Sequence, residues 1–100
     1  MPDLTSKQRA HLRGLAHGIK PTVHIGKDGV TDAAVSNLQQ TFGGSELVKV
    51  RVLESAPESA KQTAHALAAA VIDTAVVQVT GRTVVLYRPD PDTPQVRLPR

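Results

Sequence analysis

Cysteine and tryptophan are absent from this 100-residue chain, and its only aromatic residues are Phe42 and Tyr87. Without cysteine the chain can form no disulfide, present no thiolate nucleophile and bind no zinc through sulfur. Its core must be aliphatic, with valine and alanine as the most frequent hydrophobic residues. A chain of this length is expected to form one domain that folds without covalent cross-links.

Long hydrophobic runs are also missing. The most apolar stretch, Ala64 to Ile72, is rich in alanine, is interrupted by His65 and is far shorter than the roughly 20 residues that cross a bilayer. The first residues include Asp3 and a polar stretch over 5–9, unlike the apolar core of a signal peptide. We therefore predict a soluble, cytoplasmic protein with no membrane partner, and we interpret His65 as a partly buried helix residue.

The sequence patterns of known catalytic and metal sites are absent as well. The chain contains no nucleophile elbow, Walker loop or dinucleotide-binding fingerprint, and its nine acidic residues are scattered rather than paired near a histidine. No two of its four histidines stand four residues apart, the spacing of a helical metal site. The prediction is a protein that is not an enzyme and has no catalytic residue, metal ion or cofactor.

Positive charge is concentrated in the first third of the sequence. Residues 1–30 contain five lysines and arginines and two aspartates, whereas residues 31–100 contain seven cations and seven anions. The net charge of +3 therefore lies entirely before residue 31, beside three of the four histidines. Clustered charge of this kind favours a polyanionic partner, above all a nucleic acid.

The first helix should begin at the capping box formed by Thr5 and Gln8 and end at Gly18. Its apolar stripe should face the core, and consists of Leu12, Leu15, Ala16 and Ile19. Cationic side chains follow one another at intervals of four residues beside that stripe, which predicts an exposed basic ridge of Arg9, Arg13 and His17.

A short strand over 22–25 and a Gly-Lys-Asp-Gly loop over 26–29 should come next. Thr31 has the position of an N-cap for a second helix that presents Val35, Leu38 and Phe42 to the core and ends at Gly43. A strand over 46–54 should follow, in which valines alternate with Lys49 and Arg51 on the opposite face.

Ser55 and Glu58 match a capping box for a third helix, whose core side is marked by Ala60, Ala64, Leu67, Ala68 and Val71. Strands over 75–79 and 83–87 should form a hairpin with Gly81 at a position that needs positive φ. The order α-β-α-β-α-β-β predicts a two-layer α/β fold with a four-stranded mixed sheet. We assign residues 1–89 to a single domain and residues 90–100 to a proline-rich, flexible C-terminal tail.

The loop over 26–29 is a candidate anion site. Its glycines let a phosphate approach the backbone, the next helix offers N–H donors, and Lys27 adds positive charge, although Asp28 opposes it. By itself the pattern also fits an ordinary turn, as the basic ridge also fits a solvated helix surface. If the first helix packs beside the strand that follows it, Lys20, His24 and Lys27 extend the ridge to the loop as a track for a phosphate backbone. His24 also fits a plain surface residue.

The scarcity of aromatic residues excludes an RRM, which stacks bases on aromatic side chains. A KH domain also has a GxxG loop, but that loop joins two helices, whereas a strand is predicted before this one. Binding should therefore depend on phosphates and shape, with weak sequence preference.

Several segments together resemble those of a known family. They lie around the first helix (4–13, 15–17 and 20–21), in the loop (25–29) and in the later strands (46–51, 77–82 and 85–89). They are similar to the CRM domain (chloroplast RNA splicing and ribosome maturation), above all to its stand-alone bacterial YhbY-like form. The resemblance covers about residues 3–89. Gly43-Gly44-Ser45 departs from the family pattern, which shortens the second helix, and the tail has no counterpart.

The resemblance implies an RNA-binding domain whose fold is similar to the C-terminal domain of translation initiation factor 3 and which associates with precursors of the large ribosomal subunit. Carried onto this chain, the family's loop is Gly26, Lys27, Asp28 and Gly29, and its basic surface is Arg9, Arg13, His17 and Lys20 with help from Arg82 and Arg88.

The leading prediction is a monomeric RNA-binding protein, not an enzyme, that binds structured rRNA through the basic first helix and the GxxG loop during large ribosomal subunit assembly. Two alternatives stay open. One is a protein-interaction module on ribosomal particles, in which the basic helix meets an acidic protein. The other is a small enzyme that acts on an anionic metabolite in the loop.

Overall fold

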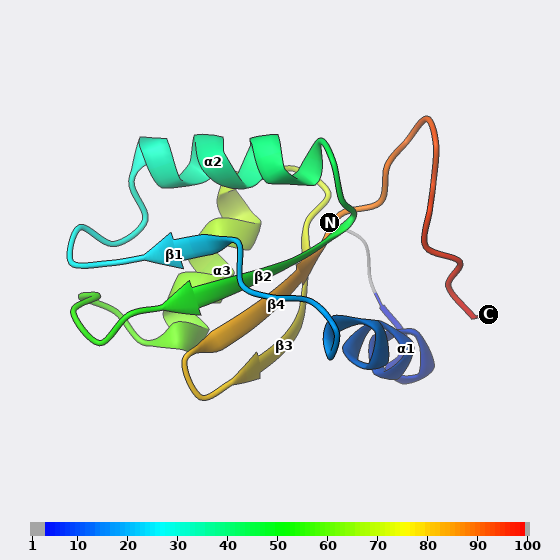
Figure 1. The fold of residues 1–100 in the computed structure, drawn as a ribbon, viewed down its shortest axis with the longest axis horizontal. Helices are drawn as coiled ribbons and strands as arrows, with labels where there is room; N and C mark the ends of the chain where they lie inside the picture. Colours follow the sequence, from blue (N-terminus) through cyan, green and yellow to red (C-terminus); the bar gives the residue numbers. More distant parts are fainter. Residues whose placement is uncertain (1–3, 100) are drawn as a thin grey trace.

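A computed structural model describes residues 4–99, so the first three residues of the predicted domain, Asp3 among them, and the last residue of the predicted tail lie outside the described part. The elements are α1 (Ser6–Ala16), β1 (Val23–Ile25), α2 (Asp32–Phe42), β2 (Leu47–Val52), α3 (Ala60–Ala70), β3 (Ala75–Thr80) and β4 (Thr83–Tyr87) (Figure 1). The predicted α/β class and element order are confirmed. None of the described helices has the length and hydrophobicity that a membrane crossing requires.

The four strands form one sheet in the order β1-β2-β4-β3. β1 and β2 are parallel, while β4 is antiparallel to both β2 and β3, so the sheet is mixed, as predicted. The tight turn before β4 has Gly81 at a φ of +58°, which glycine adopts without strain. β4 therefore returns between β2 and β3, at the centre of the sheet.

The helices cover the sheet from both sides. α2 packs on β1 and β2, and α3 packs on β3 and β4, over a core of inward valines and leucines. α1 packs on the opposite face, over a second apolar cluster that includes Leu12, Leu47 and Tyr87. Figure 1 shows α1 and α2 on opposite sides of the strands. The prediction has two layers, one of helices and one of strands. In the structure α2 and α3 form the helical layer, and α1 forms a partial third layer on the other side of the sheet. We call its side of the sheet the outer face.

The helix caps are partly those predicted. Thr5 and Gln8 form the capping box of α1, and Thr31 caps α2 by accepting a hydrogen bond from the Ala34 N–H. The capping box of α3 is Ser59 and Gln62, not Ser55 and Glu58. Pro57 explains the later start, since its ring disfavours a helical conformation at the residue before it.

Two exposure predictions are wrong. Leu15 is 44% exposed, because α1 rests on the sheet through a narrower stripe centred on Leu12 and Ala16. His65 is exposed rather than partly buried. It follows the buried Ala64 by about 100° around α3 and so lies away from the sheet.

The C-terminal segment makes contacts that the sequence did not predict. The side chain of Glu46 is buried, and its carboxylate accepts hydrogen bonds from the backbone N–H groups of Asp90 (2.8 Å), Gln95 and Val96 (2.7 Å). Val96 and Leu98 pack against the apolar cluster under α1. Glu46 therefore holds the segment beside the outer face.

Candidate nucleic-acid interface

The Gly26–Gly29 loop forms a tight turn in which the N–H of Gly29 donates to the carbonyl of Gly26 at 2.9 Å. Gly29 has a φ of +67°, and a Cβ at this position would lie 3.1 Å from Cγ of Pro57. Gly26 has no such restriction, since a Cβ there would make only ordinary contacts with Leu53. Glycine at position 29 is thus explained by the turn itself, while Lys27 and Asp28 are exposed between the two glycines.

An open pocket of about 430 Å³ lies between this loop and the first turns of α2. His24 and Lys27 line it together with Thr31 and Asn37. The N-terminus of α2 contributes partial positive charge, but Asp32 in its first turn and Asp28 in the loop contribute full negative charges. The loop alone is consequently a weak phosphate site, and further cations are needed nearby.

The basic ridge of α1 is exposed, as predicted. Arg9, Arg13 and His17 are all open to solvent, and α1 contains no acidic residue. Lys20 is exposed in the connection between α1 and β1. This surface carries charge of one sign.

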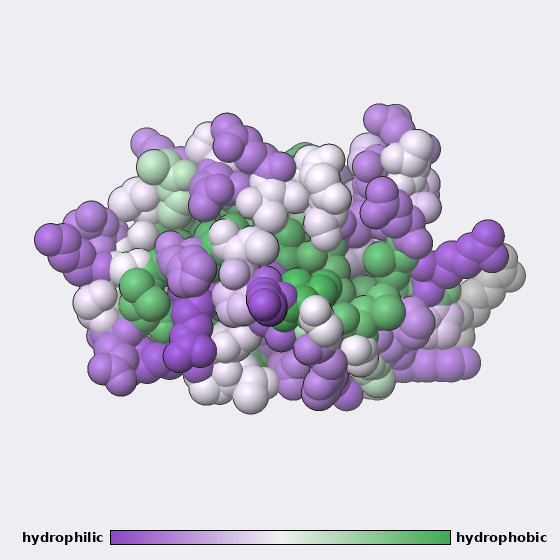
Figure 2. Space-filling view, viewed as in Figure 1, coloured by the Kyte–Doolittle hydropathy of each residue, from purple (hydrophilic) through white to green (hydrophobic). Residues whose placement is uncertain are grey.

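The basic ridge of α1 would meet the loop directly only if α1 packed beside β1, and it does not. α1 packs mainly across β2, β3 and β4 rather than beside β1. The loop and α1 consequently lie toward opposite ends of the 38 Å long axis (Figure 1). Figure 2 shows hydrophilic surface at the loop end, on the left of the view.

Outward residues of the strands bridge the gap. Val48, Val50 and Val52 face the inner core, so Lys49 and Arg51 between them face outward. His24 pairs with Arg51 in the parallel β1–β2 register and shares this face. We call the set of Arg9, Arg13, His17, Lys49, Arg51, His24 and Lys27 the basic band. The alternation with valines predicts that Lys49 and Arg51 face outward, and it is the signal by which these two residues, absent from the predicted site, could have been included.

The two remaining predicted arginines lie at different ends of the sheet. Nη1 of Arg82 donates to the carbonyl of Leu53 at 3.3 Å, and the N–H of Leu53 donates to Ile25 at the end of β1. Arg82 thus lies at the loop end. Arg88 follows the other end of β4, beside Glu46 and Asp90, and is not brought together with the loop.

Neither aromatic side chain is available for stacking. Phe42 is 7% exposed and Tyr87 is 3% exposed, and the sequence has no others. Burial, and secondarily the Glu46 carboxylate, raise the pKa of Tyr87 above its ordinary value of 10.0. This surface can therefore contact phosphates and sugars through cations and hydrogen-bond donors, but it offers no platform of tyrosine, phenylalanine or tryptophan.

Comparisons with known proteins identify relatives of this chain. Residues 4–88 match the CRS1/YhbY (CRM) domain family. The chain is 35% identical to "Probable RNA-binding protein YqeI" of Bacillus subtilis, over 96% of this chain and 99% of that one. It is 33% identical to "RNA-binding protein" of Haemophilus influenzae, over 100% of this chain and 99% of that one.

A solved structure is also similar. The solution structure of hypothetical protein SAV1595 from Staphylococcus aureus matches with a TM-score of 0.81 at 36% identity, covering 97% of this chain and 100% of that one. Sequence and structure lead to the same assignment over nearly the whole length. The chain belongs to the CRS1/YhbY (CRM) domain family.

Proposed function

We propose that this protein is a monomeric cytoplasmic RNA-binding protein, without catalytic activity, that binds structured rRNA during assembly of the large ribosomal subunit. Relatives that cover nearly the same length are named RNA-binding proteins. The link to the large subunit comes from the resemblance to bacterial YhbY-like proteins. In this role the protein would hold or protect folded rRNA segments.

The observation that carries the proposal is a row of cationic side chains, with no acidic residue among them, on α1 and at the outward positions of β1 and β2. The outward positions of β1 and β2 include His24, Lys49 and Arg51 and no carboxylate. α1 adds its own cations without any acid, and Lys27 extends the band to the loop. Clustered cations attract a polyanion, and binding gains free energy from the counterions that the polyanion releases.

The absence of exposed phenylalanine, tyrosine and tryptophan side chains favours structured RNA over single strands. Proteins that bind single strands without sequence preference stack bases on aromatic side chains, each base contributing about 1–3 kcal/mol. This surface lacks such side chains. It can instead contact the phosphates and 2′-hydroxyl groups of a folded RNA, which present a regular shape.

Salt-dependent binding to a structured rRNA fragment tests the proposal. Lys27→Ala and Arg13→Ala should each weaken binding to a similar degree across sequences and reduce the salt dependence by about one phosphate contact. Lys61→Ala is a matched control, because Lys61 is an exposed lysine on α3, which packs on the other face of the sheet. Unchanged affinity and salt dependence in the double variant Arg13→Ala/Lys27→Ala would remove the basic band as the binding surface.

A further inference from the structure

The outer face of the sheet has a covered half and an open half. Leu47, Val77, Val85 and Tyr87 belong to the apolar cluster that α1 and the C-terminal segment cover, and Val85 borders the open half. The strand register then gives two rows across β2, β4 and β3, namely Lys49–Val85–Gln78 and Arg51–Thr83–Thr80. Each row crosses two strand spacings, roughly 10 Å. Apart from Val85, these rows are polar or cationic.

A β-bulge in β3 turns polar side chains toward the open half of the outer face. The pairing with β4 shifts between Val76 and Gln78, so Val77 is the extra residue. In a regular strand Gln78 and Thr80 would lie on the same face as Val76, which packs against the inner core. The bulge instead pairs Gln78 with Val85 and Thr80 with Thr83, on the outer face. Bulges that redirect side chains in this way are frequent next to functional sites.

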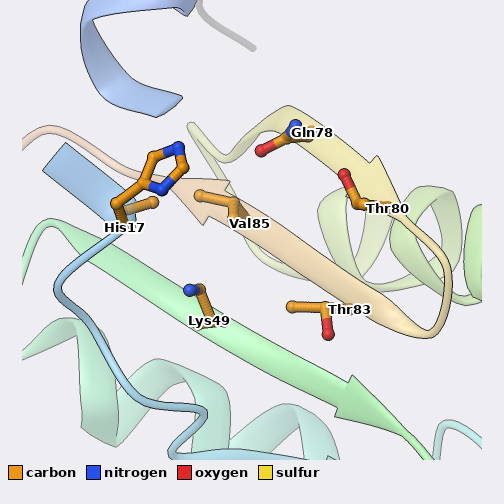
Figure 3. Close-up of a pocket in the computed structure, with 7 residues that line it drawn as sticks. His17, Lys49, Gln78, Thr80, Thr83 and Val85 are labelled. Carbon is orange, nitrogen blue, oxygen red and sulfur yellow. The ribbon is translucent and has the colours of Figure 1, made fainter. Parts of the chain in front are cut away.

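These residues line a pocket of about 290 Å³ below the C-terminal end of α1. Figure 3 shows His17 at its α1 side, Gln78 and Thr80 on β3, Thr83 and Val85 on β4, and Lys49 on β2. Val85 is 3% exposed and forms an apolar floor. The volume is at the small end of ligand pockets, which are about 300–1,000 Å³, and suits a ligand of the size of one nucleotide.

The chemistry of the lining favours a base with its phosphate over a free anion. The C-terminal end of α1 carries partial negative charge, which disfavours a bare phosphate beside Ala16 and His17. The amide of Gln78 both donates and accepts hydrogen bonds, and the hydroxyl groups of two threonines do the same. Lys49 supplies positive charge on the β2 side of the pocket, opposite Gln78 on β3 (Figure 3).

We infer that this pocket binds one unpaired nucleotide of the RNA held on the basic band. The inference rests on the proposed function, since the band supplies most of the affinity. The base lies over Val85 with its edge toward Gln78, the imidazole of His17 stacks at the rim, and Lys49 meets the backbone phosphate. An amide side chain can pair with adenine through one donor and one acceptor, which makes an unpaired adenosine the preferred probe.

Two RNA hairpins with the same stem provide the test, one fully paired and one with a single bulged adenosine. The unaltered protein should bind the bulged hairpin roughly tenfold more tightly. Gln78→Leu and Thr83→Val should abolish this preference and leave the affinity for the fully paired hairpin unchanged. Gln40→Leu is the control, because Gln40 is exposed on α2 at the other face. The near-ultraviolet circular dichroism of the buried Tyr87 verifies that each variant is folded.

The outcomes separate the inference from the proposed function. Equal binding of both hairpins, weakened by Lys27→Ala but not by Gln78→Leu, would overturn the nucleotide pocket while the proposed function stands. Failure to bind either hairpin at low salt would contradict the proposed function itself. The side-chain amide resonance of Gln78 should shift only with the bulged hairpin. A shift caused by a polyglutamate peptide and not by this RNA would overturn the inference in favour of a protein partner.

Discussion

Gly29 and Gly26 flank the same loop but differ in what the backbone requires of them. At Gly29 the φ of +67° and the approach of Pro57 both oppose a side chain, whereas Gly26 has room for one. Gly29→Ala should lower the free energy of unfolding by about 1–2 kcal/mol, the usual cost of a left-handed conformation for a residue with a Cβ. Gly26→Ala is the matched control and should stay within about 0.5 kcal/mol of the unaltered protein. Urea unfolding measures both, and equal effects at the two positions would contradict the turn geometry.

Tyr87 reports on the covered half of the outer face, because it is the only tyrosine. Burial and the Glu46 carboxylate raise its pKa above 10.0, so the unfolded chain ionises first as the pH rises. The buried, neutral Tyr87 therefore contributes to the free energy of unfolding at pH values below the pKa of the unfolded chain. This contribution should decline as the pH rises above that value and be lost above the pKa of the folded protein. The absorbance of tyrosinate in native and urea-unfolded protein measures the two midpoints. Tyr87→Phe should remove this part of the pH dependence. A native midpoint at or below the unfolded one would contradict the assignment.

The caps of α1 and α2 follow from short sequence patterns, since each cap contacts residues three positions away. The start of α3 shows where such patterns fail. Ser55–Glu58 and Ser59–Gln62 both match a capping box, and only the later one is used, because Pro57 interrupts the earlier one. The position of α1 across the sheet and the bulge in β3 depend on packing between distant segments. Local periodicity therefore predicts the ridge and the loop, but not that Lys49 and Arg51 lie between them or that Gln78 shares the outer face.

The hydrogen bonds between Glu46 and the C-terminal segment follow from no local sequence pattern, because Glu46 lies more than 40 residues before its hydrogen-bond donors. Glu46→Gln should lower the free energy of unfolding by about 2 kcal/mol, since hydrogen bonds to a charged group are replaced by weaker ones. The amides of Asp90 and Val96 should exchange slowly with solvent in the unaltered protein and rapidly in the variant. Glu54→Gln, at an exposed position just after β2, is the control. Rapid exchange of these amides in the unaltered protein would favour the flexible tail expected from the prolines.

At the scale of the molecule, a net charge of +3 is too small to identify a partner, but its placement is informative. The inner face of the sheet is closed by α2 and α3, and neither α1 nor the outward positions of β1 and β2 contain an acidic residue. The basic band therefore follows the one side of the sheet that the helices leave partly open. The cations of the first 30 residues contribute its two ends, and β2 contributes its middle.

Sedimentation of cell extracts tests the central claim most directly, with the protein followed by immunodetection. At low salt the unaltered protein should migrate with precursors of the large ribosomal subunit and return to the free fraction after nuclease treatment. The variant Arg13→Ala/Lys27→Ala should migrate mainly as free protein, because two phosphate contacts are lost. Migration of the unaltered protein only in the free fraction, or equal association of protein and variant with the particles, would contradict the account.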